Sequence, residues 1–236
     1  MSLPVLVIQH EDDDPIHRMG EWMAVDLDVR RPDLGDDLPT SLDAHPALVV
    51  MGGAMGANDD ATSPWLPAVR ELIRLAAAAD VPTLGICLGH QLAAVALGGE
   101  VLPNPKGRQL GLYDVGWEPG AHLDELFSTV ATARRGAHWN DDIVTRVPEG
   151  AEVMARASNG DVQAVRYAPT VWGVQWHPEV DEPLFRTWFE DGTVDPAVAE
   201  QVLDVMAGAG EELERAWRPL AVRFAELVAP RVVGRA

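Results

Sequence analysis

Gly85-Ile86-Cys87-Leu88-Gly89 joins two apolar segments of this chain. Residues 81–86 predict a buried strand, and the Ala/Leu-rich residues 91–97 predict a helix. A strand that turns into a helix through Gly-x-Cys-x-Gly has the form of a nucleophile elbow, with Cys where hydrolases carry Ser. Such a turn is sharp and strained, so a side chain at either glycine would clash. The segment therefore predicts an α/β protein with a nucleophile at the end of a central strand.

Cys87 is the only cysteine in the chain. An elbow would lift its sulfur clear of the sheet, exposed, at a helix N-terminus where the helix dipole favours negative charge. A lone cysteine is otherwise a small core hydrophobe, but its place in the elbow favours a nucleophile. A single cysteine also excludes an internal disulfide and any Cys-cluster metal site.

Composition and charge limit the class of protein and its partners. With 236 residues and 47% hydrophobic content, the chain has enough material for one α/β domain with a sizeable core. The formal net charge of −19 argues against nucleic acid or an anionic membrane as partner. The acidity is attributed to solubility rather than to a dedicated basic partner. No signal peptide and no run of transmembrane length is found, so a cytoplasmic protein is expected.

The first half of the chain predicts a parallel sheet with helices between the strands. Buried strands are expected near 3–8, 25–29, 47–51 and 81–86, with helices up to about residue 24 and over 64–79. His10 and the acidic residues 11–14 have the composition of metal ligands, but a solvated loop at the end of the first strand is the favoured interpretation. Residues 30–45, rich in Asp and Pro, predict a loop.

Gly52 and Gly53 follow the expected strand 47–51 directly. The carboxyl ends of parallel strands are where open α/β sheets bind ligands. Without Cβ atoms, backbone N–H groups at such a glycine pair can close around an anion. Together with the elbow, the pair is a candidate for half of an oxyanion hole.

From residue 100 to residue 176 the sequence consists of short apolar runs at β spacing, separated by frequent turns. Strands are expected near residues 115–117, 151–156, 162–167 and 171–175. These strands predict an antiparallel or mixed sheet beside the parallel core.

His177-Pro178-Glu179 follows the last expected strand. Residues i and i+2 of an extended chain share a face, so the imidazole and the carboxylate can align. His177 would then take the thiol proton of Cys87, and Glu179 would orient the ring and stabilise its charged form. Such a sequence is also common in simple turns, but the elbow cysteine favours a catalytic role.

Apolar residues recur every three or four positions from about 195 to 228, which predicts an amphipathic helix, or two helices that meet at Pro219. We expect residues 191–236 to form a helical C-terminal extension packed on the domain formed by residues 1–190. A homodimer contact through this helix is the alternative.

Three motifs in this order resemble the class I glutamine amidotransferases, in particular stand-alone proteins similar to the glutaminase domain of GMP synthase. The resemblance covers roughly residues 3–182. It implies a flavodoxin-like fold with a parallel core, a mixed or antiparallel extension and helices on both faces. The motifs are Met51-Gly52-Gly53, Gly85-Ile86-Cys87-Leu88-Gly89-His90-Gln91 and Gly173-Val174-Gln175-Trp176-His177-Pro178-Glu179.

The resemblance also implies residue roles. Cys87 attacks the side-chain amide of glutamine to form a γ-glutamyl thioester, and His177 acts as base and then acid while Glu179 holds it. No cofactor and no metal are implied, and the ammonia passes to a separate synthetase or acceptor protein. The backbone N–H groups of Gly53 and Leu88 would form the oxyanion hole, and Gly52, Gln91, His138 and Trp139 would contact the substrate.

Two departures leave the substrate and the acceptor open. Relatives carry His-Trp-His-Gly-Asp where this chain has His138-Trp139-Asn140-Asp141-Asp142, and no fused ATP-pyrophosphatase domain is expected. One alternative is a free-standing γ-glutamyl hydrolase or peptidase that uses the same thioester on a γ-glutamyl amine or peptide. Another is a non-enzymatic thiol sensor on the same fold, which would not need a matched His-Glu pair.

Overall fold

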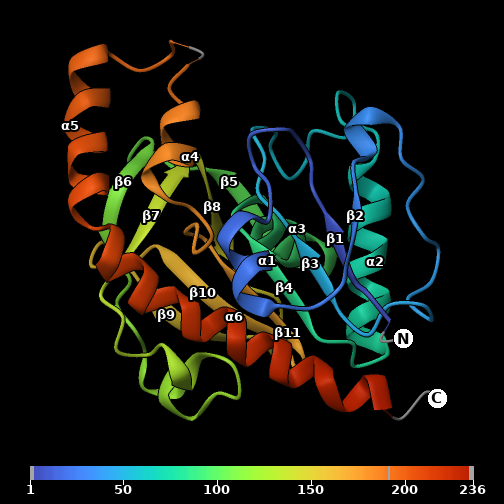
Figure 1. Cartoon of the computed structure of the whole chain (residues 1–236). Coiled ribbons are helices and arrows are strands. Elements are labelled where there is room, and N and C mark those ends of the chain that lie inside the picture. The colour runs from blue at the N-terminus through green and yellow to red at the C-terminus, as the bar shows by residue number, and fades with distance from the viewer. Residues whose placement is uncertain (1–2, 191, 234–236) are drawn as a thin grey trace.

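A seven-stranded sheet forms the centre of the computed structural model, which describes residues 3–190 and 192–233 (Figure 1). Its strands are β1 (Val5–Ile8), β2 (Leu27–Arg30), β3 (Leu48–Val50), β4 (Thr83–Ile86), β9 (Glu152–Arg156), β10 (Val162–Ala168) and β11 (Val171–Val174). They lie in the order β2-β1-β3-β4-β11-β10-β9. The first five in this order are parallel, and β10 and β9 continue the sheet antiparallel.

Two antiparallel ribbons stand beside this sheet. One pairs β5 (Glu100–Pro103) with β8 (Asp142–Arg146), and the other pairs β6 (Gln109–Asp114) with β7 (Arg135–Asn140). The expected α/β fold with a parallel core and an antiparallel extension is confirmed. The extension does not merely lie beside the core, because β11 pairs directly with β4 and makes β10 and β9 part of the same sheet.

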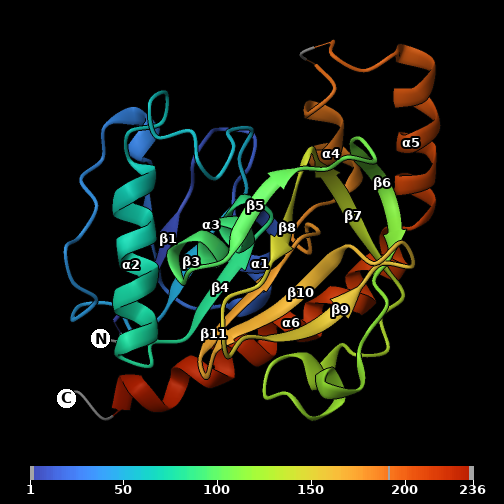
Figure 2. The same ribbon diagram turned by 180° about the vertical axis from the view of Figure 1, so that it is seen from behind.

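Helices cover both faces of the sheet (Figures 1 and 2). The helices are α1 (His17–Met23), α2 (Leu66–Ala78), α3 (Leu88–Ala96), α4 (Glu182–Thr187), α5 (Pro196–Gly208) and α6 (Gly210–Val233), with short 3₁₀ turns at η1 (Pro32–Leu34), η2 (Pro119–Leu123) and η3 (Phe127–Thr129). Buried residues of α2 and α3 form one core layer, and those of α1 and α6 belong to the other. None of the helices in the described residues is long and apolar enough to cross a membrane.

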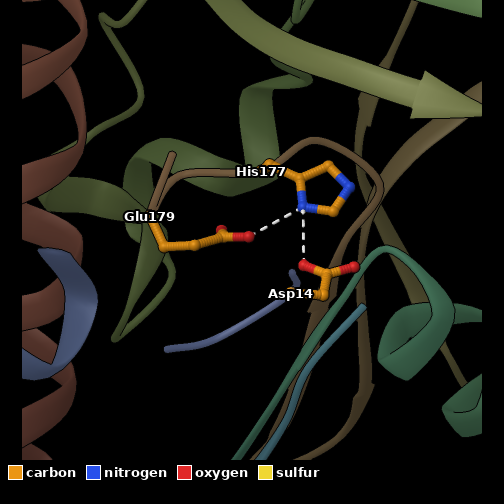
Figure 3. Close-up of side chains that lie close together, drawn as sticks. All are labelled: Asp14, His177 and Glu179. Carbon is orange, nitrogen blue, oxygen red and sulfur yellow. Dashed lines mark hydrogen bonds and ion pairs between the residues drawn. The ribbon is translucent and has the colours of Figure 1, made fainter. Parts of the chain in front are cut away.

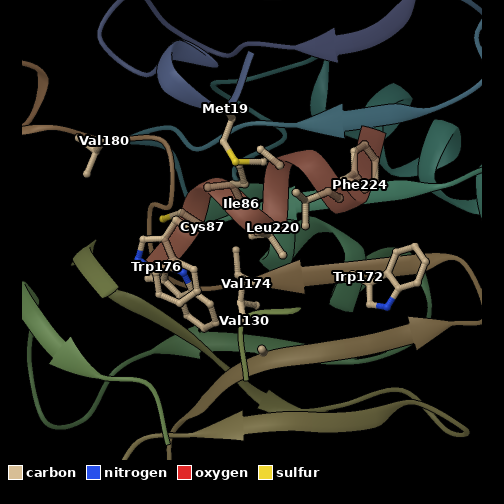
Figure 4. Close-up of a cluster of buried hydrophobic side chains, with 14 of the residues drawn as sticks. Met19, Ile86, Cys87, Val130, Trp172, Val174, Trp176, Val180, Leu220 and Phe224 are labelled. Carbon is tan, nitrogen blue, oxygen red and sulfur yellow. The ribbon is translucent and has the colours of Figure 1, made fainter. Parts of the chain in front are cut away.

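Successive side chains of the parallel strands point alternately into the two core layers. In β1, Val5 and Val7 belong to the layer with α1 and α6, whereas Leu6 and Ile8 belong to the layer with α2 and α3. A strand covered on both faces needs apolar side chains at every position, which explains the continuous hydrophobic runs in the sequence. Figure 4 shows part of the layer with α1 and α6, in which Cys87 lies among large apolar side chains.

Two local expectations were wrong. The strand expected near residues 115–117 is absent, since β6 ends at Asp114 and Trp117 makes only an isolated bridge to Ala155. Gly116 turns the chain there with φ of +61°, and a Cβ on it would lie 1.9 Å from the carbonyl oxygen of Arg156. The helix after the elbow also begins earlier than expected, at Leu88, directly after the cysteine.

The C-terminal helices meet near Ala209, and α6 continues without a break through Pro219. A proline inside a helix costs about 3 kcal/mol. Its neighbours Trp217 and Leu220 are almost fully buried against the core, and each such burial contributes roughly 1.5–3 kcal/mol. Packing therefore holds the helix together across the proline. The domain boundary at residue 190 and the homodimer contact stay predictions.

Candidate active site

The elbow at the end of β4 has a strained backbone at its centre. Cys87 precedes the first residue of α3 and has φ of 49° and ψ of −104°, a conformation rare for any side-chain-bearing residue. A Cβ at position 85 would lie 2.4 Å from the carbonyl oxygen of Gly89, and one at position 89 would lie 2.1 Å from that of Val50. Both flanking glycines are therefore required for the helix to pack so closely on the strands.

Cys87 is not exposed as expected, because only 5% of its surface is accessible. Its sulfur lies 3.8 Å from the backbone oxygen of Trp139 and 3.6 Å from Nε2 of Gln175, which donates to it. The side chain nevertheless lines a cavity of about 670 Å³ that His177 also lines. A substrate would thus reach the sulfur inside this cavity rather than on an open surface.

His177 and Glu179 form a close pair directly after β11 (Figure 3). Nδ1 of His177 and Oε1 of Glu179 are 2.7 Å apart, and both side chains are buried. Burial alone would disfavour a charged ring. The negative charges of Glu179, Cys87 and Asp14 outweigh it and hold the pKa of His177 well above its ordinary value.

Asp14 is a site residue that the sequence analysis missed. The composition of residues 11–14 favours a solvated loop, but Asp14 is buried and its Oδ1 lies 3.7 Å from Nδ1 of His177 (Figure 3). Burial is the main cause that raises the pKa of Asp14 to about 8, while His177 opposes the rise and Glu179 adds to it. His10 is not solvated either: it is fully buried and accepts a hydrogen bond from Nε1 of Trp65 at 3.0 Å.

Asp14, His177 and Glu179 also have the composition of a metal site, with ligand atoms within 4.8 Å of one another. Both carboxyl groups face the same ring nitrogen, Nδ1. In the short contact with Glu179 that nitrogen acts as a proton donor, and a donor nitrogen has no lone pair for a cation. The arrangement therefore fits an orienting role for the carboxylate better than metal ligation.

The glycine pair after β3 lies against the elbow. A Cβ on Gly53 would lie 3.1 Å from Cδ2 of Leu88, and one on Gly52 would lie 2.8 Å from Cε1 of His177. Within residues 3–190 and 192–233, the backbone N–H groups of Gly53 and Leu88 donate to no other protein group. The next amide, that of Ala54, is occupied by Oε1 of Glu11. The two free amides are those that the sequence analysis assigned to the oxyanion hole.

The expected substrate contacts divide into two groups. Gln91 and Trp139 line the cavity, and Nε2 of Gln91 donates to the backbone oxygen of Asp142 at 3.1 Å. Gly52 and His138 do not line it. His138 is fully buried on β7, where its Nδ1 lies 3.4 Å from Oδ1 of Asn140, and burial lowers its pKa to about 3. The burial of the His138 side chain does not support the expected substrate contact, which stays a prediction.

Two further side chains shape the site and were not singled out from the sequence. Gln175 donates to the sulfur of Cys87 and accepts from Nε2 of Gln91 at 3.3 Å. Its position two residues before His177 on an extended chain is the signal that places it on the same side. Trp188, after α4, packs edge-on against the ring of His177 with centroids 4.7 Å apart.

A thiol at such an elbow shares one cavity with an imidazole that contacts a buried carboxylate, an arrangement typical of enzymes with a cysteine nucleophile. The family described as glutamine amidotransferase class-I matches residues 15–193. The chain belongs to this family.

Solved structures are similar to this chain over nearly its whole length. A glutamine amidotransferase from Methylobacillus flagellatus superposes with a TM-score of 0.85 at 28% identity, covering 96% of this chain and 95% of that one. A glutamine amidotransferase from Thermotoga maritima superposes with a TM-score of 0.81 at 23% identity, covering 96% and 99% of the two chains. The second likeness bears on the fold alone.

Curated relatives are similar over shorter stretches. The GMP synthase (glutamine-hydrolyzing) of Clostridium novyi is 33% identical over 141 residues, which are 59% of this chain but 25% of that protein. The A-type subunit of the GMP synthase of Methanocaldococcus jannaschii is 36% identical, and 61% of it is covered, along with 50% of this chain. The corresponding A-type subunit from Halobacterium salinarum is 35% identical, over 66% of this chain and 78% of that one.

Proposed function

We propose that this protein hydrolyses the side-chain amide of glutamine through a γ-glutamyl thioester on Cys87. The observation that carries the proposal is the position of His177, which lines the same cavity as Cys87 and is held from behind by Glu179 at 2.7 Å. Because the pKa of His177 is raised, its ring can hold the proton that it takes from the thiol of Cys87. The sulfur is then a thiolate, which is the nucleophilic form.

The reaction proceeds in two acyl-transfer steps. The sulfur of Cys87 attacks the amide carbon and forms the C–S bond while His177 takes the thiol proton. The C–N bond then breaks as His177 returns the proton to the nitrogen, and ammonia leaves. Water attacks the thioester with His177 again taking a proton, the C–S bond breaks, and glutamate and the free thiol result.

The oxyanion of both steps would be bound by the amides of Gly53 and Leu88, each donor being worth about 3 kcal/mol. We infer this role from the packing of Gly53 against the Leu88 side chain and from the absence of another acceptor for either amide within the described residues. Gly53→Ala, whose Cβ would press on Leu88 and Met55, should lower kcat at least tenfold. Unchanged kcat would remove Gly53 from the oxyanion hole.

We propose that a separate synthetase protein accepts the ammonia. The support is the similarity to proteins named as the A-type subunit of a GMP synthase, a name that implies a second component. Co-purification of the tagged full chain with a synthetase from its own organism, and faster glutamine hydrolysis on its addition, would test this.

An electrophilic glutamine analogue tests the site directly. We expect it to label wild-type protein at residue 87, to label His177→Ala much more slowly, and to leave Cys87→Ser unlabelled. Ammonia release from glutamine should follow the same order. Equal labelling of wild type and His177→Ala without ammonia release would instead support the thiol-sensor alternative.

A γ-glutamyl hydrolase is the second candidate, and the size of the cavity favours it. At the roughly 30 Å³ that one water occupies in the liquid, the ten non-hydrogen atoms of glutamine would fill less than half of about 670 Å³. The remaining space is large enough for an amine larger than ammonia. Comparing kcat/KM for glutamine with that for a γ-glutamyl alkylamide would separate the two candidates.

A further inference from the structure

Carboxyl groups from four separate segments of the chain converge on the cavity that Cys87 lines. They come from the loop after β1, the loop after β3, the junction between β7 and β8, and the segment after α4. Because these segments are far apart in sequence, the cluster is a product of the fold and not of one acidic run. Its members are Glu11, Asp13, Asp14, Asp59, Asp142 and Glu190.

Positive charge on the cavity wall is scarce by comparison. Arg108 is the single Arg or Lys among the lining residues that the structure describes. Its guanidinium makes two hydrogen bonds, of 2.9 and 2.7 Å, to the carboxylate of Asp141, which also lines the cavity. The ring of His177, with its raised pKa, is a second positively charged group on the wall, and six further carboxyl groups outnumber the two.

The carboxyl groups also disturb one another. Burial and then the charges of Asp141 and Asp59 raise the pKa of Asp142, and burial and then Asp13 raise that of Glu11. Asp14 is 6% exposed, and its Oδ1 has no hydrogen-bond partner in the described part of the chain. A cation that enters the cavity would stabilise the ionised form of Asp14. It would do the same for Asp142 and Glu11, whose ionised forms are disfavoured by neighbouring carboxylates.

We propose that this site cleaves γ-glutamyl amides whose amine portion carries a positive charge, in preference to neutral or anionic ones. The inference rests on the proposed thioester chemistry of Cys87 and names the substrate class that the cavity wall selects. The γ-glutamyl group would lie at the sulfur, and the charged end of the amine would lie toward Asp59 and Asp142.

The chemistry differs from glutamine hydrolysis only in the leaving group. The C–S bond to Cys87 forms, the C–N bond breaks, and the amine leaves with the proton that His177 donates. Water then releases glutamate and restores the thiol. The positive charge at the far end of the amine is not altered, so no further reactant is needed.

Three amides of matched length test the proposal: γ-glutamyl-putrescine, γ-glutamyl-butylamine and γ-glutamyl-4-aminobutyrate, which carry a cationic, neutral and anionic end. We expect kcat/KM to fall by about tenfold at each step in this order at low ionic strength. The ratios should shrink toward one at about 0.5 M salt, where the Debye length is only a few ångströms. Glutamine hydrolysis and labelling of Cys87 are measured in parallel.

Asp59→Asn with Asp142→Asn removes two of these charges without changing side-chain size. We expect the double variant to lose most of the preference for the cationic amide, measured as the ratio of its kcat/KM for the cationic amide to that for the butylamide. Glu149→Gln, an exposed carboxyl that does not line the cavity, should keep that preference.

The outcomes separate this inference from the proposed function. Equal rates on the three amides, or a faster anionic one, would overturn the charge preference while leaving the thioester mechanism standing. A cationic preference that survives both high salt and the double variant would also overturn it. Failure to cleave glutamine or any of the amides, with no labelling of Cys87, would instead refute the proposed function.

Discussion

Oδ1 of Asp14 lies 3.7 Å from Nδ1 of His177, the same nitrogen that lies 2.7 Å from Oε1 of Glu179. Two carboxyl groups therefore face one imidazole nitrogen in a buried site. That nitrogen has a single proton, and only the shorter distance is a hydrogen bond. Glu179 thus fixes the orientation of the ring, and Asp14 acts on it through charge alone.

Asp14→Asn should change the pH profile more than the maximal activity. Because the pKa of Asp14 is raised to about 8, its carboxyl is mostly protonated at pH 6, where the variant should keep kcat within about threefold of wild type. Above pH 8 the ionised Asp14 of the wild type stabilises the charged ring, and the variant loses this support. Its kcat/KM should therefore fall at lower pH than that of the wild type. A uniform loss at every pH would indicate a structural role instead.

The same variant should change how stability depends on pH. The folded-state pKa of Asp14 lies at about 8 against an ordinary value of 3.8, so between these values the folded state holds a proton that the unfolded state has released. Wild-type stability contributed by this proton is present at low pH and is lost as pH rises through about 8. Urea unfolding of wild type and Asp14→Asn from pH 5 to 9 should show the variant gaining relative stability with rising pH. Parallel curves would contradict the raised pKa.

Glu179→Gln keeps an acceptor for Nδ1 of His177 and removes the charge. Since burial opposes a charged ring and Glu179 is the strongest group acting against it, the pKa of His177 should fall in the variant. We expect kcat/KM on glutamine to drop by about 100- to 10,000-fold. Titration of the His177 ring by NMR gives the independent readout. Glu71→Gln, on the exposed face of α2, is the matched control and should change neither quantity.

Gly89→Ala should destabilise the protein through the backbone of the elbow. The added methyl would lie 2.1 Å from the carbonyl oxygen of Val50, so α3 must move away from β3. A clash of this kind in a packed core costs about 1–3 kcal/mol or more in the free energy of unfolding. At Gly208, in α5, a Cβ meets nothing within 4 Å, and Gly208→Ala should be neutral or stabilising. Equal effects of the two substitutions in urea unfolding would mean that the close approach is not required.

Local pattern sufficed for the elbow and for the strands around it. The apolar run of Val5 to Ile8 is continuous because both faces of the strand are covered by core layers. Glycine at 85 is imposed by the carbonyl group of Gly89 in the same turn, whereas glycine at 89 is imposed by the carbonyl group of Val50 on the neighbouring strand. His177 and Glu179 are two residues apart on an extended chain, so their common face was predictable as well. Each of these features leaves a recognisable pattern within a few residues of the sequence, even where the contact that requires it is distant.

Asp14 was not predictable in this way, because its role depends on the order of strands. The chain places β3 on the opposite side of β1 from β2, so the loops after β1 and β3 diverge and leave a crevice between them. Asp14 occupies this crevice, where a Cβ on Gly52 would lie 2.4 Å from its Oδ2. In composition, residues 11–14 are no different from a solvated acidic loop.

The burial of His138 and the continuity of α6 through Pro219 were not predictable from local pattern, for related reasons. The pairing of β6 with β7 sets which side of the ribbon each residue occupies, and it turns the backbone oxygen of Trp139 toward Cys87 while the His138 side chain is buried elsewhere. The local penalty of Pro219 is real, but it is smaller than what α6 gains by packing on residues far away in sequence. Tertiary contacts decided both cases.

Trp217→Ala tests whether the C-terminal helices and the rest of the chain unfold as one unit. Trp217 is 1% exposed and packs on Trp176, with ring centroids 4.8 Å apart, and Trp176 directly precedes His177. We expect a loss of about 3–5 kcal/mol in the free energy of unfolding, together with lower kcat, because the packing beneath the segment that carries His177 is removed. Val222→Ala, on the same helix but 40% exposed, should cost less than about 1 kcal/mol. If α6 is part of one cooperative domain, far-UV and near-UV signals of the Trp217 variant must shift together in a single transition; an early separate loss of helix with unchanged glutaminase activity would make the C-terminal segment an independent unit.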